Sequence, residues 1–265
     1  LSSESHPAVP RARTDRRERE KKRRSIGEEG CSARGDGVTS ADPDRTASFS
    51  LRSLRLPTQM TAALCLENVT KRYGQTVAVD GVSFTAEPGR LFGLLGPNGA
   101  GKTSTIRMVT NITTPDEGTI TLGGTPVGPA SQARMGYLPE ERGLYRKLKV
   151  GEQLIYLARL KGMTEADATA SVRRWLDRFD GLDWAGKKTE ELSKGMQQKV
   201  QFISTVVHDP TLVILDEPFS GLDPINADLL VEVIGELREG GRTVLFASHR
   251  MESVEALCDD LCLMA

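Results

Sequence analysis

The sequence predicts an α/β fold with a parallel sheet. Short apolar runs alternate with segments whose apolar residues recur at helical spacing, the pattern of strands that alternate with helices. Two runs, residues 90–95 and 212–215, are apolar almost throughout, as expected of strands buried on both faces of a sheet. A glycine-rich stretch, residues 96–103, follows the first run and precedes a helical segment.

The first expected elements are strands at residues 64–69 and 77–84, joined by a turn around Tyr73 and Gly74. Further strands are expected at residues 90–95, 118–122, 134–138, 212–215, 243–247 and 261–264. Helices are expected at residues 104–110, 150–160, 164–179, 197–207, 225–237 and 251–257.

The helix at residues 164–179 has the clearest signals. Thr164 is expected to cap its N-terminus, with Asp167 three residues further on. One face carries large apolar side chains and is expected to join the core: Val172, Trp175, Leu176 and Phe179.

Residues 1–62 differ from the rest of the chain. They contain a basic run that includes residues 21–24, followed by polar residues with almost no apolar periodicity. Such a segment buries too little apolar surface to offset its ordering entropy, so we expect a disordered basic tail. An arm that binds nucleic acid or anionic lipid is the alternative. Because Met60 directly precedes the first strand, we also hypothesise that the natural protein starts there.

Composition limits the other classes of function. The chain has 265 residues, a formal net charge of −1 and 38% hydrophobic residues, which allows one large domain or two small ones. Its cysteines are scattered and are expected to be reduced thiols: Cys31, Cys65, Cys258 and Cys262. Cys258 and Cys262 stand at helical i, i+4 spacing, without a second pair to complete a zinc site. Since no apolar run approaches the roughly 20 residues that span a bilayer, any membrane role requires a partner.

Residues 96–103 fit the phosphate-binding pattern of Gly, four free positions and Gly-Lys-Thr. A strand, a glycine loop and a helix in this order direct backbone N–H groups and a positive helix terminus at a phosphate. In this pattern Lys102 reaches the β- and γ-phosphates, and the Thr103 hydroxyl binds Mg²⁺.

Two acidic residues follow the apolar run at 212–215. A strand there delivers Asp216 and Glu217 to its carboxyl end, where open α/β sheets bind their ligands. Asp216 suits the Mg²⁺ shell, and Glu217 suits the orientation or deprotonation of an attacking water. His249 follows the strand at 243–247 and is expected to reach the γ-phosphate.

The order of motifs resembles that of ATP-binding cassette (ABC) ATPases. Residues 96–103, 192–198, 215–218, 220–223 and 248–249 occur in the family's order, and the resemblance covers residues 63–265. It implies a P-loop NTPase core with a parallel sheet, an antiparallel β subdomain and an inserted α-helical signature subdomain at residues 139–195. It also implies ATP and Mg²⁺ as cofactors.

The resemblance assigns further roles to individual residues. Tyr73 resembles the aromatic residue that stacks on adenine. Ser193 and Gly195 match the signature motif, which contacts ATP held by the opposite subunit, and Asp223 resembles a residue of the dimer interface. His249 resembles the switch histidine, Asp216 the acid near Mg²⁺, and Glu217 the catalytic base. The Walker A segment corresponds to Gly96, Asn98, Gly99, Ala100, Gly101, Lys102, Thr103 and Ser104.

The sequence departs from the family at two motifs. The signature has Lys194 where Gly is commoner, which adds a positive charge near the γ-phosphate. Glu140 stands where the family usually has Gln, and we expect it to face Mg²⁺ as a catalytic residue and metal ligand. Both variants resemble the ABC-2 type exporter branch, which includes sodium-efflux ATPases. The family continues beyond the strand at 261–264, so a C-terminally truncated product is expected.

Three functions are compatible with these observations. The first is the ATPase subunit of an exporter, paired with a transmembrane permease and a second ATP-binding subunit at the cytoplasmic face of the membrane. The permease would dock at residues 144–148. The second is a soluble ABC ATPase acting on ribosomes or DNA, although relatives of that kind carry two cassettes or a long coiled coil, so no nucleic-acid partner is expected. The third is a fragment that binds nucleotide without turnover, or is inactive.

Overall fold

The computed structural model describes residues 64–141 and 143–265. In these ranges no helix is both long enough and apolar enough to cross a lipid bilayer. The expected basic tail and the hypothesis about Met60 concern residues outside the described ranges.

An antiparallel sheet forms the first part of the fold. The chain runs up β1 (Leu64–Tyr73) and back down β2 (Thr76–Ala86), with the predicted turn between them. The sheet order is β2-β1-β4-β5, where β4 is Glu117–Leu122 and β5 is Thr125–Pro126. The sequence did not indicate β5, a strand too short to show any periodicity.

The parallel sheet is the centre of the fold. Its strand order is β6-β7-β8-β3-β9, and every neighbouring pair is parallel. The order differs from the chain order because helices cross over between strands. The strands are β3 (Leu91–Leu95), β6 (Met135–Leu138), β7 (Leu212–Asp216), β8 (Thr243–Ser248) and β9 (Asp260–Leu263).

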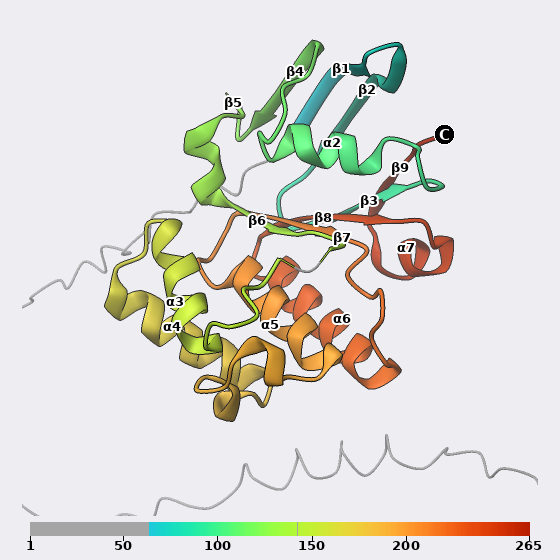
Figure 1. Ribbon diagram of the computed structural model, residues 1–265. Coiled ribbons are helices and arrows are strands. Elements are labelled where there is room, and N and C mark those ends of the chain that lie inside the picture. The colour runs from blue at the N-terminus through green and yellow to red at the C-terminus, as the bar shows by residue number, and fades with distance from the viewer. Residues whose placement is uncertain (1–63, 142) are drawn as a thin grey trace, which may run out of the picture. The chain divides into compact units, whose positions relative to one another are not determined.

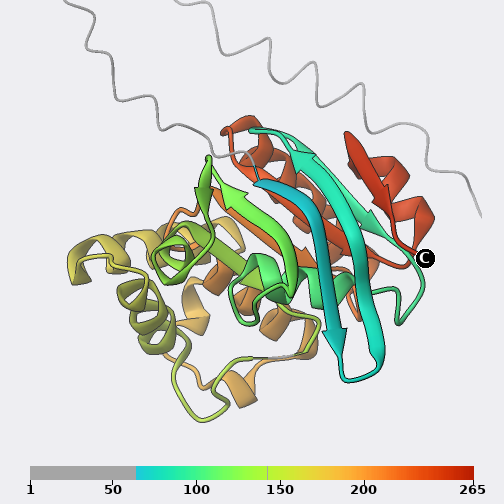
Figure 2. The same ribbon diagram turned by 90° about the horizontal axis from the view of Figure 1, so that it is seen from above.

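Helices cover both faces of this sheet (Figure 1). Helix α2 (Lys102–Val109) lies between the two sheets, and the other helices lie across the opposite face of the parallel sheet. Figure 2 shows the antiparallel sheet over α2 from above. The helices of the opposite face are α3 (Val150–Leu160), α4 (Glu165–Arg178), α5 (Lys194–Val206), α6 (Pro224–Glu239) and α7 (Met251–Leu257). Short 3-10 turns are η1 (Pro129–Arg134), η2 (Leu182–Trp184) and η3 (Thr189–Glu191).

Strand β7 shows how the sheet separates two cores. Leu212 and Ile214 belong to the core that contains α2 and the antiparallel sheet. Val213 and Leu215 belong to the core that contains the helices of the other face. A strand alternates its side chains between faces, so only a strand without polar interruption can serve two cores. The predicted α/β fold is confirmed, with its antiparallel sheet and its helical segment at α3 and α4.

Local signals in the helices also agree with the structure. The Thr164 hydroxyl accepts a hydrogen bond from the backbone N–H of Asp167 and caps α4. Three of the four predicted core residues of this helix are buried, while Trp175 is half-buried. The helical spacing of Cys258 and Cys262 has no structural counterpart, because Cys258 follows the end of α7 and Cys262 lies in β9.

Candidate nucleotide site

The phosphate loop joins the end of β3 to the start of α2. Gly101 adopts a φ of 91°, and a Cβ at this position would lie 2.2 Å from the carbonyl oxygen of Ala78 on β2. Only glycine therefore allows the loop to lie this close to the antiparallel sheet. Among the described residues no side chain caps α2, and no acidic residue lies in its first turn. The helix N-terminus is available to an anion.

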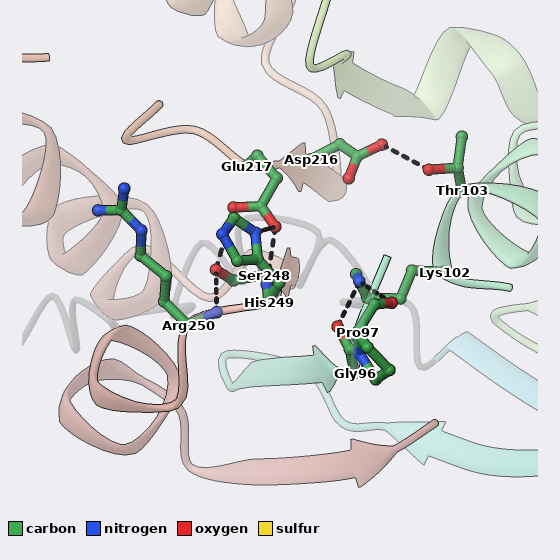
Figure 3. A network of polar contacts seen from close by, with 9 residues as sticks. All are labelled: Gly96, Pro97, Lys102, Thr103, Asp216, Glu217, Ser248, His249 and Arg250. Atoms are coloured by element: carbon green, nitrogen blue, oxygen red, sulfur yellow. Dashed lines mark hydrogen bonds and ion pairs between the residues drawn. The ribbon is translucent and has the colours of Figure 1, made fainter. Parts of the chain in front are cut away.

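Lys102 is folded back onto the loop from which it comes. Its ammonium group is buried and donates hydrogen bonds to the carbonyl oxygens of Gly96 at 2.5 Å and Pro97 at 3.0 Å (Figure 3). A buried ammonium requires such partners. Phosphate oxygens are stronger acceptors than these carbonyls because they carry charge, so Lys102 is placed to exchange its partners when a phosphate enters the loop.

Asp216 ends β7 beside the first turn of α2. The Thr103 hydroxyl donates to Asp216 Oδ2 at 3.4 Å, and only 3% of the Asp216 surface is exposed. Burial raises the pKa of Asp216 to about 6, and the nearby charges of Glu140 and Glu217 add to this effect. A cation at this position would favour the ionised form.

The oxygen groups here fit Mg²⁺ that is bound together with a nucleotide. The Thr103 hydroxyl and the Asp216 carboxylate are adjacent, and Glu140 lines the same cavity. In the described ranges no group of three His, Cys, Asp or Glu residues could hold a metal ion. Mg²⁺ is usually bound through one or two carboxylates and completes its shell with phosphate and water, and the two carboxylates here fit that pattern.

Glu217 has both carboxylate oxygens occupied. Its Oε1 accepts from the backbone N–H of His249 at 2.7 Å and lies 2.7 Å from His249 Nδ1, while its Oε2 accepts from the Ser248 hydroxyl at 3.1 Å (Figure 3). Its backbone has a φ of 49°, a conformation that non-glycine residues seldom adopt. Such a backbone is characteristic of functional sites, where the surrounding structure imposes it.

The predicted phosphate, metal and base residues share one cavity of about 290 Å³. It is lined by Ala78, Asn98, Gly99, Gly101, Lys102, Thr103, Ser104, Glu140, Asp216 and Glu217. Gly96 contributes a carbonyl to Lys102, and Ala100 lies within the loop. Ala78 was not predicted, since a small residue within a strand carries no sequence signal.

Two residues that the sequence predicted for this site, Tyr73 and His249, are not among those that line the cavity in the described part of the chain. Tyr73 is at the end of β1 with 46% of its surface exposed, and His249 contacts Glu217 from outside the cavity. Ser248, which sequence reasoning did not assign a role, holds the second oxygen of Glu217. Its position directly before His249 was the only available signal.

The remaining predicted residues form a separate surface site. Ser193 is exposed, caps α5 and accepts from the backbone N–H of Met196 at 3.3 Å. Asp223 is exposed, caps α6, and lies against Gly195, where a Cβ would be 3.9 Å from its Oδ2. Hydrogen bonds from the backbone N–H and side chain of Asn226 lower the pKa of Asp223.

Lys194 also lies away from the phosphate loop. With Arg146 it lines a second cavity of about 400 Å³ between the segment before α3 and the start of α5. Lys194 therefore does not bring its positive charge to a phosphate in the chain's own nucleotide cavity. The expected charge near a γ-phosphate would have to act on a nucleotide that is held by another subunit.

Comparisons with known proteins point in one direction. Residues 79–220 match the family model described as ABC transporter. A shorter segment, residues 187–255, also matches a model described as AAA domain, putative AbiEii toxin, Type IV TA system. The chain is 53% identical over 201 residues to an uncharacterized ABC transporter ATP-binding protein, YhaQ, of Bacillus subtilis (strain 168). That alignment covers 76% of this chain and 67% of the relative.

Two further similarities extend this finding. A Nod factor export ATP-binding protein I of Paraburkholderia xenovorans (strain LB400) is 40% identical over 206 residues, which are 77% of this chain and 68% of that protein. A solved structure of an ATP binding subunit of an ABC transporter superposes with a TM-score of 0.71 at 30% identity. The superposition covers 76% of this chain and 85% of the solved chain.

Proposed function

The chain belongs to the ABC transporter family as an ATP-binding protein, and from this premise we propose that it hydrolyses ATP to drive export through a separate transmembrane permease. One observation carries the proposal. A phosphate loop, a buried carboxylate beside the loop threonine, and a second carboxylate one residue further on all line one cavity. This is the set of groups that phosphoryl transfer to water requires.

Each group in the cavity has a distinct task in the proposed reaction. Lys102 and the α2 N-terminus would bind the phosphates, and Thr103, Asp216 and Glu140 would hold Mg²⁺. The ion would supply positive charge that offsets the negative charge of the phosphate oxygens. Glu217 accepts a proton from the attacking water, a contribution of about 10²- to 10⁴-fold in rate for a positioned base.

Glu217 must first release one of its hydrogen bonds. Ser248 and His249 occupy both of its oxygens. We propose that His249 turns its side chain toward the γ-phosphate when nucleotide is bound, which opens one lone pair of Glu217 Oε1 to water while the backbone N–H of His249 keeps the other. The Glu217 contact with the His249 backbone N–H keeps the carboxylate near the end of β8 during this change.

The exposed site around Ser193 and Asp223 supports a dimer. Ser193 and Gly195 lie at the N-terminus of α5, which is suited to bind an anion, yet they do not line the chain's own nucleotide cavity. We propose that they contact ATP held by a second ATP-binding subunit, which is either an identical or a different chain. The nucleotide then lies between two subunits, and binding closes the dimer.

Trapping the closed dimer tests hydrolysis and dimerisation together. Glu217→Gln removes the base but keeps the side-chain shape, so the variant should bind Mg-ATP, fail to hydrolyse it and form a dimer detected by light scattering. Glu239→Gln, on the exposed C-terminal turn of α6, is the matched control and should retain turnover. Lys102→Ala should abolish binding. A Glu217→Gln variant that hydrolyses ATP as fast as the wild type would contradict the assigned base.

We propose the segment at residues 144–148 as the docking surface for the permease. Tyr145 and Leu148 are 57% and 43% exposed. Leu144, the first residue of this segment, lines a cavity of about 260 Å³ together with Leu157 and Leu160. Exposed apolar side chains in the same segment as a residue of a mainly apolar cavity suit a contact with a peptide segment of a partner. In this proposal the chain lies at the cytoplasmic face of the membrane through that contact.

Export is the proposed direction, on the basis of similarity to a Nod factor export protein and of the unusual Glu140. Co-expression with the membrane protein encoded by a neighbouring reading frame tests the docking contact on which export depends, and uptake of substrate into inverted vesicles of the same cells tests the direction. The chain should be retained on membrane vesicles, and Tyr145→Asp should release it. Retention without any membrane protein would contradict docking through a permease.

An ATP-binding protein without turnover is the alternative function, and it predicts that the wild type binds ATP but releases no phosphate.

A further inference from the structure

Lys71 is a buried lysine next to the predicted adenine-stacking residue. Only 9% of its surface is exposed, and its ammonium group donates to the carbonyl oxygen of Thr114 at 2.8 Å and to Asp116 Oδ1 at 2.9 Å. The same ammonium group lies 5.6 Å from the centroid of the Tyr73 ring. This distance is within the range of a cation–π interaction.

Asp116 ties the end of β1 to the segment between α2 and β4. Its second carboxylate oxygen accepts from the backbone N–H of Arg72 at 2.6 Å, and its own N–H donates to the Thr70 carbonyl at 2.9 Å. Hydrogen bonds from Lys71 and from the Arg72 N–H lower the pKa of Asp116. The Lys71 ammonium group is thus held in place by two hydrogen-bond acceptors while it lies beside the Tyr73 ring.

This face of the hairpin is directed toward the phosphate loop. The pairing of β1 with β2 is irregular between Lys71 and Arg72, yet Lys71 and Tyr73 are two apart on β1 and their side chains meet, as the distance between the ammonium group and the ring shows. Lys71 pairs with Val79 on β2, and a Val79 methyl carbon would lie 3.2 Å from a Cβ at Gly101 in the phosphate loop. Tyr73 is therefore anchored on the side of the hairpin that borders the nucleotide cavity, with 46% of its surface still open.

We infer that Lys71 is a positioning residue for the nucleotide base. Held by Asp116 and Thr114, it covers one face of the Tyr73 ring and keeps the other face open for adenine. The inference rests on the proposed nucleotide site and on the proposed contact between Tyr73 and the base. If the inference is right, a change at Lys71 affects the contact with the base and leaves the contacts with the phosphates unchanged.

Calorimetric titration of the full-length chain with ATP and with tripolyphosphate separates these contacts. Lys71→Met should lower the affinity for ATP by about 2- to 5-fold, the range expected for an exposed cation–π contact. The affinity for tripolyphosphate should not change, because that ligand has no base. Lys71→Arg keeps the charge and should restore ATP affinity. Arg72→Met is the matched control on the same strand, since Arg72 pairs with Glu117 and should affect neither ligand.

A double-mutant cycle with Tyr73→Leu completes the test. If Lys71 acts through Tyr73, then Lys71→Met should cause no further loss of ATP affinity in the Tyr73→Leu background. An equal loss in both backgrounds, or an equal loss for ATP and tripolyphosphate, would overturn the inference. Asp116→Asn serves as a second variant in case Lys71→Met does not fold. It removes the charge that anchors Lys71 and should give the same ATP-selective loss.

The outcomes also separate this inference from the proposed function. A Tyr73→Leu variant with wild-type ATP affinity would overturn the base contact and the inference, and would leave the phosphate site intact. ATP-selective loss in Tyr73→Leu but not in Lys71→Met would overturn the inference alone. A wild-type chain that binds neither ATP nor tripolyphosphate would overturn the proposed function itself.

Discussion

Replacing Asp216 with Asn should stabilise the nucleotide-free chain while it abolishes the proposed hydrolysis of ATP. Burial raises the pKa of Asp216 from its ordinary value of 3.8 to about 6. One pKa unit corresponds to about 1.36 kcal/mol, so the ionised carboxylate lowers the free energy of unfolding by about 3 kcal/mol at neutral pH. Asn has the same shape, still accepts from Thr103 and carries no charge to desolvate.

The sign of the pH dependence follows from the raised pKa. The folded chain binds the proton more tightly than the unfolded chain, so the wild type loses stability as pH rises from about 4 through about 6. The advantage of Asp216→Asn should therefore approach about 3 kcal/mol above pH 7 and disappear toward pH 4.

Urea unfolding without Mg²⁺ or nucleotide, at a series of pH values, measures this difference. Asp183→Asn is the control, because Asp183 forms an exposed ion pair with Lys187 and should change stability by less than about 1 kcal/mol. An Asp216→Asn chain less stable than the wild type at pH 7.5, or an advantage that does not depend on pH, would refute the argument from burial.

Three further predictions concern neighbouring groups. Gly101→Ala should lower the free energy of unfolding by about 1–3 kcal/mol more than Gly99→Ala, since both have φ near 90° but only Gly101 faces a backbone carbonyl; equal losses in urea unfolding would contradict this. Ser248→Ala should cost about 1–3 kcal/mol because a buried hydrogen bond to Glu217 is lost, and a neutral effect in the same assay would show that the bond contributes nothing. Burial raises the pKa of Cys258 to about 12, so it should react more slowly at pH 8 than a free thiol, as mass spectrometry after iodoacetamide labelling would show.

Much of the fold was predictable because its elements depend on local sequence. The apolar run at β7 and the helical spacing of α3 are signals that neighbouring residues carry themselves. The Thr164 cap is likewise a contact over three residues. The strand order of the parallel sheet was not predictable, because pairing between β3 and β8 joins residues far apart in the chain.

The candidate site also has features that local sequence predicts and features that depend on contacts between distant parts of the chain. Lys102, Thr103, Asp216 and Glu217 were found from motifs, and the structure brings them into one cavity. The contact of His249 with Glu217 was not expected, since it depends on how the ends of β7 and β8 lie side by side. The anchoring of Lys71 by Asp116 depends on a pair 45 residues apart, which no local pattern indicates.

The hydrogen bonds to both oxygens of Glu217 also act as a brace between two strands of the parallel sheet. Glu217 follows the carboxyl end of β7, while Ser248 ends β8 and His249 follows it, so these contacts join the two strands just beyond their last paired residues. If nucleotide binding turns His249 away, as proposed, the side-chain part of this brace is lost and the Ser248 and backbone contacts remain. The segment after β8 would then be freer to move in the nucleotide-bound chain than in the empty one.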